Sequence, residues 1–246
     1  QQVLAQLDAI DQAALSTEGR VNYAVYRAQI LDLIDAVNQR TYQMPFNSDS
    51  SFWSNLGFMA QRRLADVQQA EDYIAVLEDV PRHFDQQITN MRAGLARGFS
   101  VPRAVLDGRE VSIAMVAGLK DPVASPLYAP LTKLPASIPA AEQARLQARA
   151  RAAIGQKVVP AFATLLTFFN NEYVPQARTT LAAEAMPDGE AFYRSQIREY
   201  TTLDLSPAQI HQIGLAEVAR IRAEMDAVID HTGFTGNSSK TRFADF

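Results

Sequence analysis

The sequence predicts an all-α fold, a multi-helix array of long, partly kinked antiparallel helices. Two observations predict it. Apolar residues recur at three- and four-residue spacing through most of the chain, and no segment shows sustained alternation of apolar and polar residues. Apolar residues make up 48% of the 246 residues, which is enough to form a substantial core. We therefore expect helices packed on helices, without a sheet.

The first 40 residues are expected to be mainly helical. Amphipathic spacing over 3–10 predicts a short helix, and a longer apolar repeat over 21–37 predicts a long one. Ser16 and the residues after it precede the long repeat and are typical of a helix cap. The long helix is expected to end before Pro45, because the residue before a proline disfavours helical torsion angles.

Two helices are expected in the next part of the chain. Apolar residues recur at helical spacing over 67–80 and again over 84–95. Pro81 is expected to separate the two helices, because its ring removes a backbone donor. Gly98 is expected to end the second helix as a C-cap glycine. A further short helix is expected around 104–119.

Segment 121–139 contains five prolines and is predicted to be a linker or a long surface loop. Helical spacing resumes over 140–173, where Pro160 is expected to kink the helix. A helix from about 190 to 200 follows the turn at 186–189. This pattern predicts an N-terminal helical region, a proline-rich connection and a second helical region.

The clearest helix signal begins at Ser206. Ser206 at the N-cap, Pro207 at the first helical position and Gln209 three residues after the cap form a capping box. Apolar residues then recur at three and four positions over 210–228, and Gly233 is expected to end this helix.

The predicted domain boundaries follow from these elements. We expect an N-terminal helical region at 1–120, the proline-rich connection at 121–139, a second helical region at 140–236 and an irregular tail at 237–246. The alternative is one continuous helical domain.

Composition restricts the classes of partner and chemistry. The chain has no cysteine, which excludes disulfides, thiolate catalysis and cysteine-rich zinc sites. Its net charge of −4 gives no reason to expect nucleic acid as a partner, because phosphate binding needs a clustered basic surface. No apolar run approaches about 20 residues, so no transmembrane segment is expected. Two localisations stay open: cytoplasmic, or exported with the signal peptide removed.

No residue pattern names a reaction. None of the three histidines, His83, His211 and His231, has another histidine four positions away, the spacing of a helical zinc site. Glu217 and Glu224 flank Arg220 at helical spacing, which is typical of an exposed charge ladder. Nucleophile-elbow, phosphate-loop and dinucleotide motifs are absent from the sequence. We therefore predict no catalytic residue, no metal ligand and no cofactor in this chain.

The polar segment 47–51 is bracketed by large rings, Phe46 on one side and Phe52 and Trp53 on the other. Such rings either pin a loop to the protein body or present it to a ligand, and pinning is the more common arrangement. If the loop does contact a ligand, Asn47, Asp49 and Phe52 are the candidate substrate-binding residues.

Three separated segments resemble a bacterial family known as domain of unknown function 885 (DUF885). They are Met-Pro-Phe-Asn-Ser-Asp-Ser-Ser-Phe at 44–52, Gly-Phe-Ser-Val-Pro at 98–102, and 201–221, which contains Ile-His-x-x-Gly-Leu-x-Glu-Val. The resemblance extends in the same order and spacing from the start of the chain to about Gly236. The residues 237–246 are polar and poorly patterned, and we expect them to depart from the family.

Members of this family are large helical proteins similar to zinc metallopeptidases, with a His-Glu-x-x-Pro-Gly-His motif downstream of the third segment. The resemblance implies that this chain corresponds to the N-terminal half of such a fold. It also implies that zinc and a peptide substrate belong to a full-length relative, because the motif is absent here. The chain alone is then expected to be inactive and to self-associate through exposed apolar surface. The alternative is a stand-alone helical binding or scaffold protein without catalysis.

Overall fold

The computed structural model describes residues 1–234, and in that range it contains helices and no strand. One isolated β-bridge joins Phe46 and Ser51. The predicted all-α class is confirmed. The chain divides into two compact units, Leu33–Gly189 and a second unit formed by Gln1–Asp32 with Glu190–Phe246. We refer to Leu33–Gly189 as the central unit and to the other as the terminal unit.

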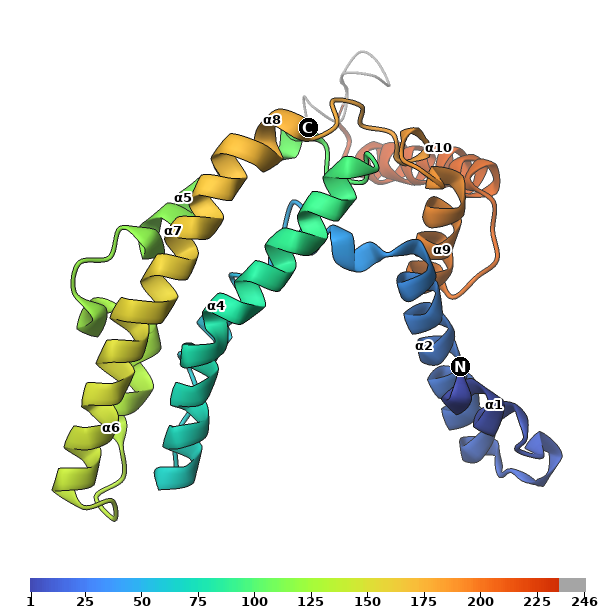
Figure 1. Ribbon diagram of the computed structural model, residues 1–246. Helices are drawn as coiled ribbons and strands as arrows, with labels where there is room; N and C mark the ends of the chain where they lie inside the picture. The colour runs from blue at the N-terminus through green and yellow to red at the C-terminus, as the bar shows by residue number, and fades with distance from the viewer. Residues whose placement is uncertain (235–246) are drawn as a thin grey trace. The chain divides into compact units, whose positions relative to one another are not determined.

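The central unit contains two long helical rods (Figure 1). One is α4, Val67–Ala96, and the other is the sequence of α6, α7 and α8. The helices of this unit are α3 Leu56–Met59, α4 Val67–Ala96, α5 Glu110–Ala117, α6 Ala140–Ala153, α7 Val159–Phe168 and α8 Val174–Gln176. Short 3-10 helices lie at Thr41–Gln43, Arg103–Val105, Pro122–Ala124, Pro126–Lys133 and Ala183–Ala185.

The two rods run parallel to each other. Glu78 of α4 pairs with Arg149 of α6, and further along both rods Phe84 packs on Phe162. The antiparallel arrangement that we expected is therefore wrong for this pair. The reason is the long segment 97–139, which contains α5 and returns the chain to the starting end of α4 before α6 begins (Figure 1).

Pro81 does not divide α4. The helix continues from Val67 to Ala96 with the proline inside it, so the predicted break is wrong. An interior proline costs about 3 kcal/mol. The side chains of Leu77, Val80 and Phe84 on either side of it are buried, and each such burial contributes about 1.5–3 kcal/mol. Packing of the continuous apolar face therefore outweighs the local cost of the proline.

In the second rod a π-helical turn precedes each of the two prolines. A π-helical turn, Ile154–Val158, precedes Pro160, and another, Phe169–Tyr173, precedes Pro175. A π turn changes the hydrogen-bond register by one residue, and such turns are one recognised cause of local helix distortion. The rod remains helical through Pro160, and the kink predicted at this proline stays a prediction.

The core of the central unit is rich in aromatic side chains. Phe84 and Phe162 join α4 to α7 with their ring centroids 4.9 Å apart, and Phe169 stacks on Tyr173 at an interplanar angle of 12°. Tyr173 is fully buried, and this burial raises the pKa of its phenol well above the ordinary value. Its hydroxyl oxygen lies 3.4 Å from the backbone nitrogen of Val101, which donates to it.

The proline-rich segment 121–139 contributes to this core. Leu127, Tyr128 and Leu131 are buried, although the segment forms only 3-10 helices. The buried hydroxyl of Tyr73 donates to the carbonyl oxygen of Leu127 at 2.7 Å. Burial raises the pKa of Tyr73 to about 12. The segment is therefore fixed to α4, and the boundaries that we placed on either side of it stay a prediction.

Ion pairs join α4 to α6 on the exposed side of the rods. The Arg149 guanidinium binds Glu78 through two hydrogen bonds of 2.8 and 2.6 Å and also pairs with Glu71. Arg145 pairs with Glu71 and with Glu142 of its own helix. The hydrogen bond from Arg149 holds the pKa of the Glu78 carboxyl below its ordinary value.

Replacing Arg149 by glutamine is expected to change how stability depends on pH. Because folding lowers the pKa of Glu78, the pair stabilises the native state above pH 4.5, the ordinary pKa, and loses this contribution as pH falls through the folded pKa. Both side chains are 36% exposed, so we expect a loss of at most about 1 kcal/mol. Urea unfolding from pH 7 to pH 3 measures it. Arg151→Gln, which removes from the same helix an exposed charge that has no ion pair within residues 1–234, should retain the wild-type acid dependence.

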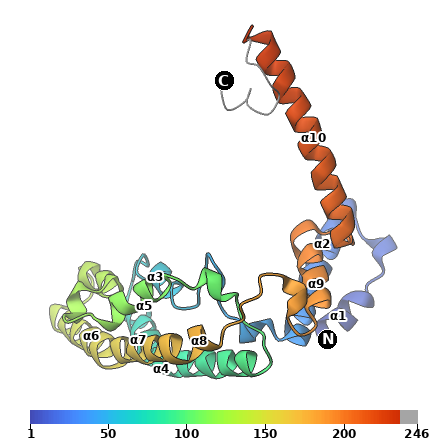
Figure 2. The ribbon, with the colours of Figure 1, turned by 90° about the horizontal axis from the view of Figure 1, so that it is seen from above.

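The terminal unit contains α1 Gln2–Asp8, most of α2 Thr17–Gln39, α9 Gly189–Thr201 and α10 Pro207–His231. The predicted caps are confirmed. The hydroxyl oxygen of Ser16 accepts from the nitrogen of Gly19 at 3.0 Å, and Ser206 and Gln209 form the complete capping box at the start of α10. Figure 2 shows α10 as one uninterrupted helix.

The apolar residues of α2 and α10 are largely exposed. Val21 and Val25 of α2 and Val218 of α10 each expose more than half of their surface, and Ile229 is the only buried residue of α10. The helices were predicted at these positions, but within the described residues their apolar faces do not form a core. Exposed apolar surface of this kind is typical of an interaction site.

One helical segment, Ala140–Gln176, is long and apolar enough to cross a membrane by length and composition. Its most apolar window has a mean hydropathy of 1.4, and 44% of that window is buried inside the protein. The core helix of a water-soluble protein meets the same criterion, so this finding is weak support for a membrane span.

Candidate functional site

The loop predicted from its aromatic residues is a tight turn in the central unit. The bridge between Phe46 and Ser51 closes it, and the nitrogen of Asn47 donates to the carbonyl oxygen of Ser50 at 3.0 Å. The Asn47 side-chain oxygen accepts from the nitrogens of Asp49 and Ser50 at 2.8 and 2.7 Å. This pattern is an Asx turn, which makes the tip rigid through its own side chain.

The rings on both sides of the loop are buried. Phe46, Phe52 and Trp53 are at most 8% exposed, and Phe46 and Trp53 have ring centroids 5.2 Å apart. Phe52 packs edge-on against Phe84 of α4. The Trp53 indole nitrogen donates to the Ser112 hydroxyl of α5 at 3.0 Å. The aromatic residues therefore pin the loop to the protein body, as we predicted.

Arg109 clamps the loop from the start of α5. Its guanidinium donates to the carbonyl oxygens of Asn47, Ser48 and Ser50 at 3.0, 3.0 and 3.3 Å. The guanidinium carbon lies 5.9 Å from the Trp53 ring centroid. The Arg109 Nε is buried and has no hydrogen-bond partner among the residues that the structure describes. The Arg109 side chain thus donates to three carbonyl oxygens of the loop. The Asp49 carboxylate at the tip is exposed and has no partner in the described chain.

Replacing Arg109 by glutamine is expected to release this loop without unfolding the helices. Three hydrogen bonds from a charged donor are lost, and each is worth about 1.5–3 kcal/mol at most. We expect faster hydrogen exchange of the loop amides and a red shift in emission of Trp53, the only tryptophan. Unchanged exchange and emission would contradict the clamp. Arg103→Gln, which changes an arginine away from the loop, should leave both signals as in the wild type.

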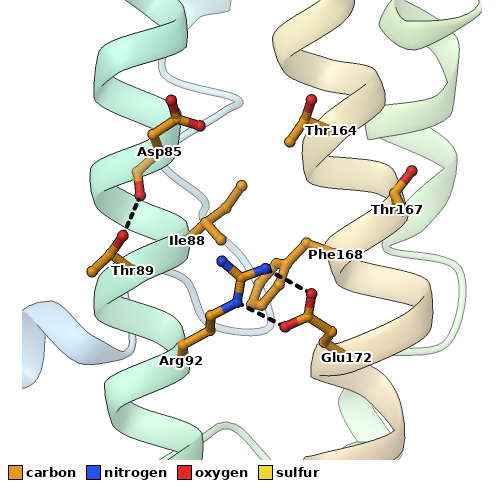
Figure 3. A pocket seen from close by; sticks show the side chains of 8 residues that line it. All are labelled: Asp85, Ile88, Thr89, Arg92, Thr164, Thr167, Phe168 and Glu172. Atoms are coloured by element: carbon orange, nitrogen blue, oxygen red, sulfur yellow. Dashed lines mark hydrogen bonds and ion pairs between the residues drawn. The ribbon is translucent and has the colours of Figure 1, made fainter.

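A second candidate site is a polar groove between α4 and α7, with a cavity volume of about 430 Å³ (Figure 3). Its floor contains the buried side chains of Ile88 and Phe168. Asp85 lies toward one end and the pair of Arg92 and Glu172 toward the other (Figure 3). Apolar floors with a few polar groups at the rim are typical of small-molecule sites.

The ion pair at the end of the groove is bidentate. Arg92 donates to the two carboxylate oxygens of Glu172 at 2.7 and 2.6 Å, and its guanidinium carbon lies 5.2 Å from the Phe168 ring centroid. The hydrogen bonds from Arg92 hold the pKa of the Glu172 carboxyl below its ordinary value. The pair joins α4 to the π turn at this end of the groove.

The groove has the chemistry of a binding site. The hydroxyls of Thr89 and Thr167 donate to backbone carbonyl oxygens of their own helices at 2.8 and 3.0 Å. The lining contains two carboxylates, Asp85 and Glu172, and no histidine. The Glu172 carboxylate is paired with Arg92. The groove therefore offers hydroxyl and carboxylate oxygens that can accept hydrogen bonds from a ligand.

Metal ligands are not brought together in residues 1–234. No group of three or more histidine, cysteine or carboxylate side chains there could hold a metal ion. His83 packs against Phe52 with ring centroids 5.9 Å apart. His211 and His231 lie near the two ends of α10, and the Nδ1 of His231 is 2.7 Å from the carbonyl oxygen of Ala227. Glu217 and Glu224 both pair with Arg220, which is the predicted charge ladder.

The residues proposed from the sequence differ in how they are placed. Asn47 and Asp49 lie at the exposed tip of the loop, whereas Phe52 lies beneath it in the core. Their role in substrate binding stays a prediction. Sequence reasoning missed Arg109 and the pair of Arg92 and Glu172. Arg109 lies 59 to 62 positions from its partners in the loop, and Arg92 lies 80 positions from Glu172. No local sequence pattern marks partners that far apart.

Comparison with a solved structure indicates the fold. The chain is similar to the crystal structure described as "the putative lipoprotein from Colwellia psychrerythraea", with a TM-score of 0.71 and 24% sequence identity. The alignment covers 81% of this chain and 35% of that one, so the chain spans about a third of the length of the lipoprotein. At this identity the likeness shows the fold alone. Among curated proteins, none matches the sequence.

Comparison with protein families gives a match over the full length. The model of a family described as "Bacterial protein of unknown function (DUF885)" matches residues 1–246. The match includes 237–246, so our expectation that these residues depart from the family was wrong; their structure lies outside the described residues. The family resemblance seen in three segments of the sequence is confirmed. The chain belongs to the bacterial family DUF885.

Proposed function

We propose that this chain is the N-terminal helical portion of a zinc-dependent peptidase-like protein, and that it forms one wall of the substrate cleft. On this proposal the chain supplies no catalytic residue and no metal ligand. The observation that carries it is that the chain is much shorter than a solved protein of the same fold. The chain matches the family model over residues 1–246, yet it aligns with only 35% of that longer protein. A longer protein of this fold thus has room for a separate metal-binding part.

The exposed apolar faces of α2 and α10 support the proposal. Val218, Ile221 and Val228 of α10 are exposed and lie at helical spacing. A stable single-chain protein seldom leaves such a stripe in water, because burying each side chain contributes about 1.5–3 kcal/mol. We propose that the metal-binding part of the longer protein covers this stripe. When that part is missing, the same surface would mediate self-association.

We propose that the loop tip at 47–50 contributes to substrate binding. Arg109 and the buried rings hold it in one conformation, and preorganisation of this kind lowers the entropy lost on binding. The Asp49 carboxylate is exposed, so we propose that it contacts an amino or guanidinium group of a peptide. Asn47 would act by shaping the turn through its side-chain oxygen, and Phe52 by supporting the turn from beneath.

A helical binding or scaffold protein is the second candidate. The groove between α4 and α7 favours it, because the lining combines the apolar side chains of Ile88 and Phe168 with polar groups around them. On this alternative the protein would bind a ligand without converting it.

Zinc-dependent hydrolysis of a peptide library separates the two candidates. It should be measured for this chain and for the longest protein that its gene encodes. The proposal predicts no turnover by the chain and chelator-sensitive turnover by the longer protein. Asp49→Asn in the longer protein should raise KM with little change in kcat, while Asp107→Asn should not. A zinc-loaded longer protein that binds peptides without cleaving them would favour the scaffold alternative.

A further inference from the structure

We propose that a cleft between residues 60–65 and 129–135 of the central unit binds a small organic anion. Arg62, Arg63 and Lys133 would hold its carboxylate or phosphate, and its apolar part would lie on Leu64 and Pro130. The cleft has a volume of about 590 Å³, which is within the usual range for small-molecule sites.

The charge of the cleft is the first argument for an anion. Its lining contains three cationic side chains and no carboxylate. The protein as a whole has 23 basic and 27 acidic residues, so this local excess is opposite in sign to the net charge of −4. Three like charges around one cleft repel each other, and a bound anion would relieve that repulsion.

The lack of protein partners for these cations is the second argument. Arg62, Arg63 and Lys133 make no side-chain hydrogen bond or ion pair within the chain that the structure describes. Other arginines of the central unit, such as Arg92, Arg145 and Arg149, pair with carboxylates. Asp66, the carboxylate nearest in sequence, is occupied as the N-cap of α4, where it accepts from the nitrogen of Gln69 at 2.8 Å.

Two residues of the cleft lining also have backbone amides without an acceptor in the described part of the chain. The amide nitrogens of Arg63 and Leu64 have no hydrogen-bond acceptor within residues 1–234, although the Leu64 side chain is buried. Backbone N–H groups near the protein interior are nearly always paired, either with protein or with a bound molecule. An anion at this position would give these donors an acceptor.

The floor of the cleft determines the kind of anion. Leu64 and Pro130 are buried apolar residues, and Ala60 and Ala129 beside them are small. A ligand with an apolar body and one charged end fits this surface better than a fully hydrated inorganic ion. The planar guanidinium of arginine binds carboxylate and phosphate in the same bidentate manner, so either head group is accepted. The anion site does not depend on the peptidase-like function.

NMR titration of the amide signals at 61–65 and 129–134 tests the site. Benzoate and inorganic phosphate would be added separately at constant ionic strength, with chloride as the balancing anion. We expect saturable shifts at millimolar concentration with at least one probe. Saturation by benzoate alone identifies a carboxylate with an apolar body, and saturation by phosphate identifies a phosphate group.

Charge-removing variants show whether the named cations are responsible. Arg63→Gln and Lys133→Gln should each weaken binding by about tenfold, as expected for loss of a charge-assisted hydrogen bond. Arg151→Gln removes the same charge outside the cleft and should bind as the wild type does. Far-UV circular dichroism confirms that each variant is folded. Absence of saturation with both anions, or equal binding by wild type and both cleft variants, would overturn the proposal.

Discussion

Replacing Trp53 by alanine is expected to lower the free energy of unfolding of the central unit by about 3–5 kcal/mol. Trp53 is 3% exposed and lies in an aromatic cluster with Phe46, Phe52 and Phe169. Truncation leaves a cavity beneath the loop and leaves the Ser112 hydroxyl without its indole donor. Urea unfolding followed by circular dichroism measures the loss, since the only tryptophan is removed.

Two further variants separate the parts of this effect. Trp53→Phe retains a ring but loses the indole N–H. Loss of its hydrogen bond should lower the free energy of unfolding by about 1 kcal/mol, and the smaller ring should lower it by a further, smaller amount. Phe58→Ala changes a side chain that is 72% exposed and should shift stability by less than about 0.5 kcal/mol. If Trp53→Ala and Phe58→Ala destabilise equally, the aromatic cluster does not pin the loop.

Replacing Gly94 by alanine is expected to destabilise the central unit by about 1–3 kcal/mol or more. An added Cβ would lie 2.7 Å from the carbonyl oxygens of both Gln43 and Phe99. Both contacts are to backbone atoms, which cannot rotate away as a side chain can. The last turn of α4 closes on the same glycine, because the nitrogen of Phe99 donates to the Gly94 carbonyl oxygen at 2.8 Å. Differential scanning calorimetry measures the change.

Gly214→Ala provides the matched control. Gly214 lies inside α10, and apart from the adjoining helix backbone and its two chain neighbours, no atom of the described residues lies within 4 Å of an added Cβ. Alanine is favoured over glycine in a helix interior by about 0.5–1 kcal/mol, so this variant should be slightly more stable than the wild type. If the two substitutions destabilise the protein equally, the carbonyl oxygens of Gln43 and Phe99 are not the reason that position 94 requires glycine.

Helix positions were predictable where the signal is local. The capping box at Ser206 and the C-cap glycine at Gly98, whose φ of +76° suits glycine, depend on residues within one turn. Pro81 shows the limit of local rules. Its helix-breaking tendency was clear in the sequence, but the buried residues on both sides that override it belong to a core contributed by other helices.

The arrangement of the helices was less predictable. Adjacent helices joined by short loops pack antiparallel, and segment 97–139 gave no sign in the sequence that it returns the chain to the starting end of α4. The parallel alignment depends on contacts such as Arg92 with Glu172, 80 positions apart. Which apolar face is covered is also not a local property, as the exposed stripe of α10 shows.

The candidate site was partly predictable. Large rings around a polar segment correctly indicated a pinned loop, because rings of that size are rarely left in water. Arg109 was not identified, since an isolated arginine beside Gly108 carries no signal of the three carbonyl oxygens that it binds. The basic cleft was hidden for the same reason, because Arg62 and Lys133 come from distant segments.

The most direct test of the proposed function is to read the encoding gene beyond the codon for Phe246. We predict that the reading frame continues into a second part containing a His-Glu-x-x-Pro-Gly-His motif, which would supply the two histidines and the glutamate that a zinc peptidase site needs. A frame that stops directly after Phe246 would contradict the peptidase-like function for this molecule. The helical binding or scaffold protein would then be the better description.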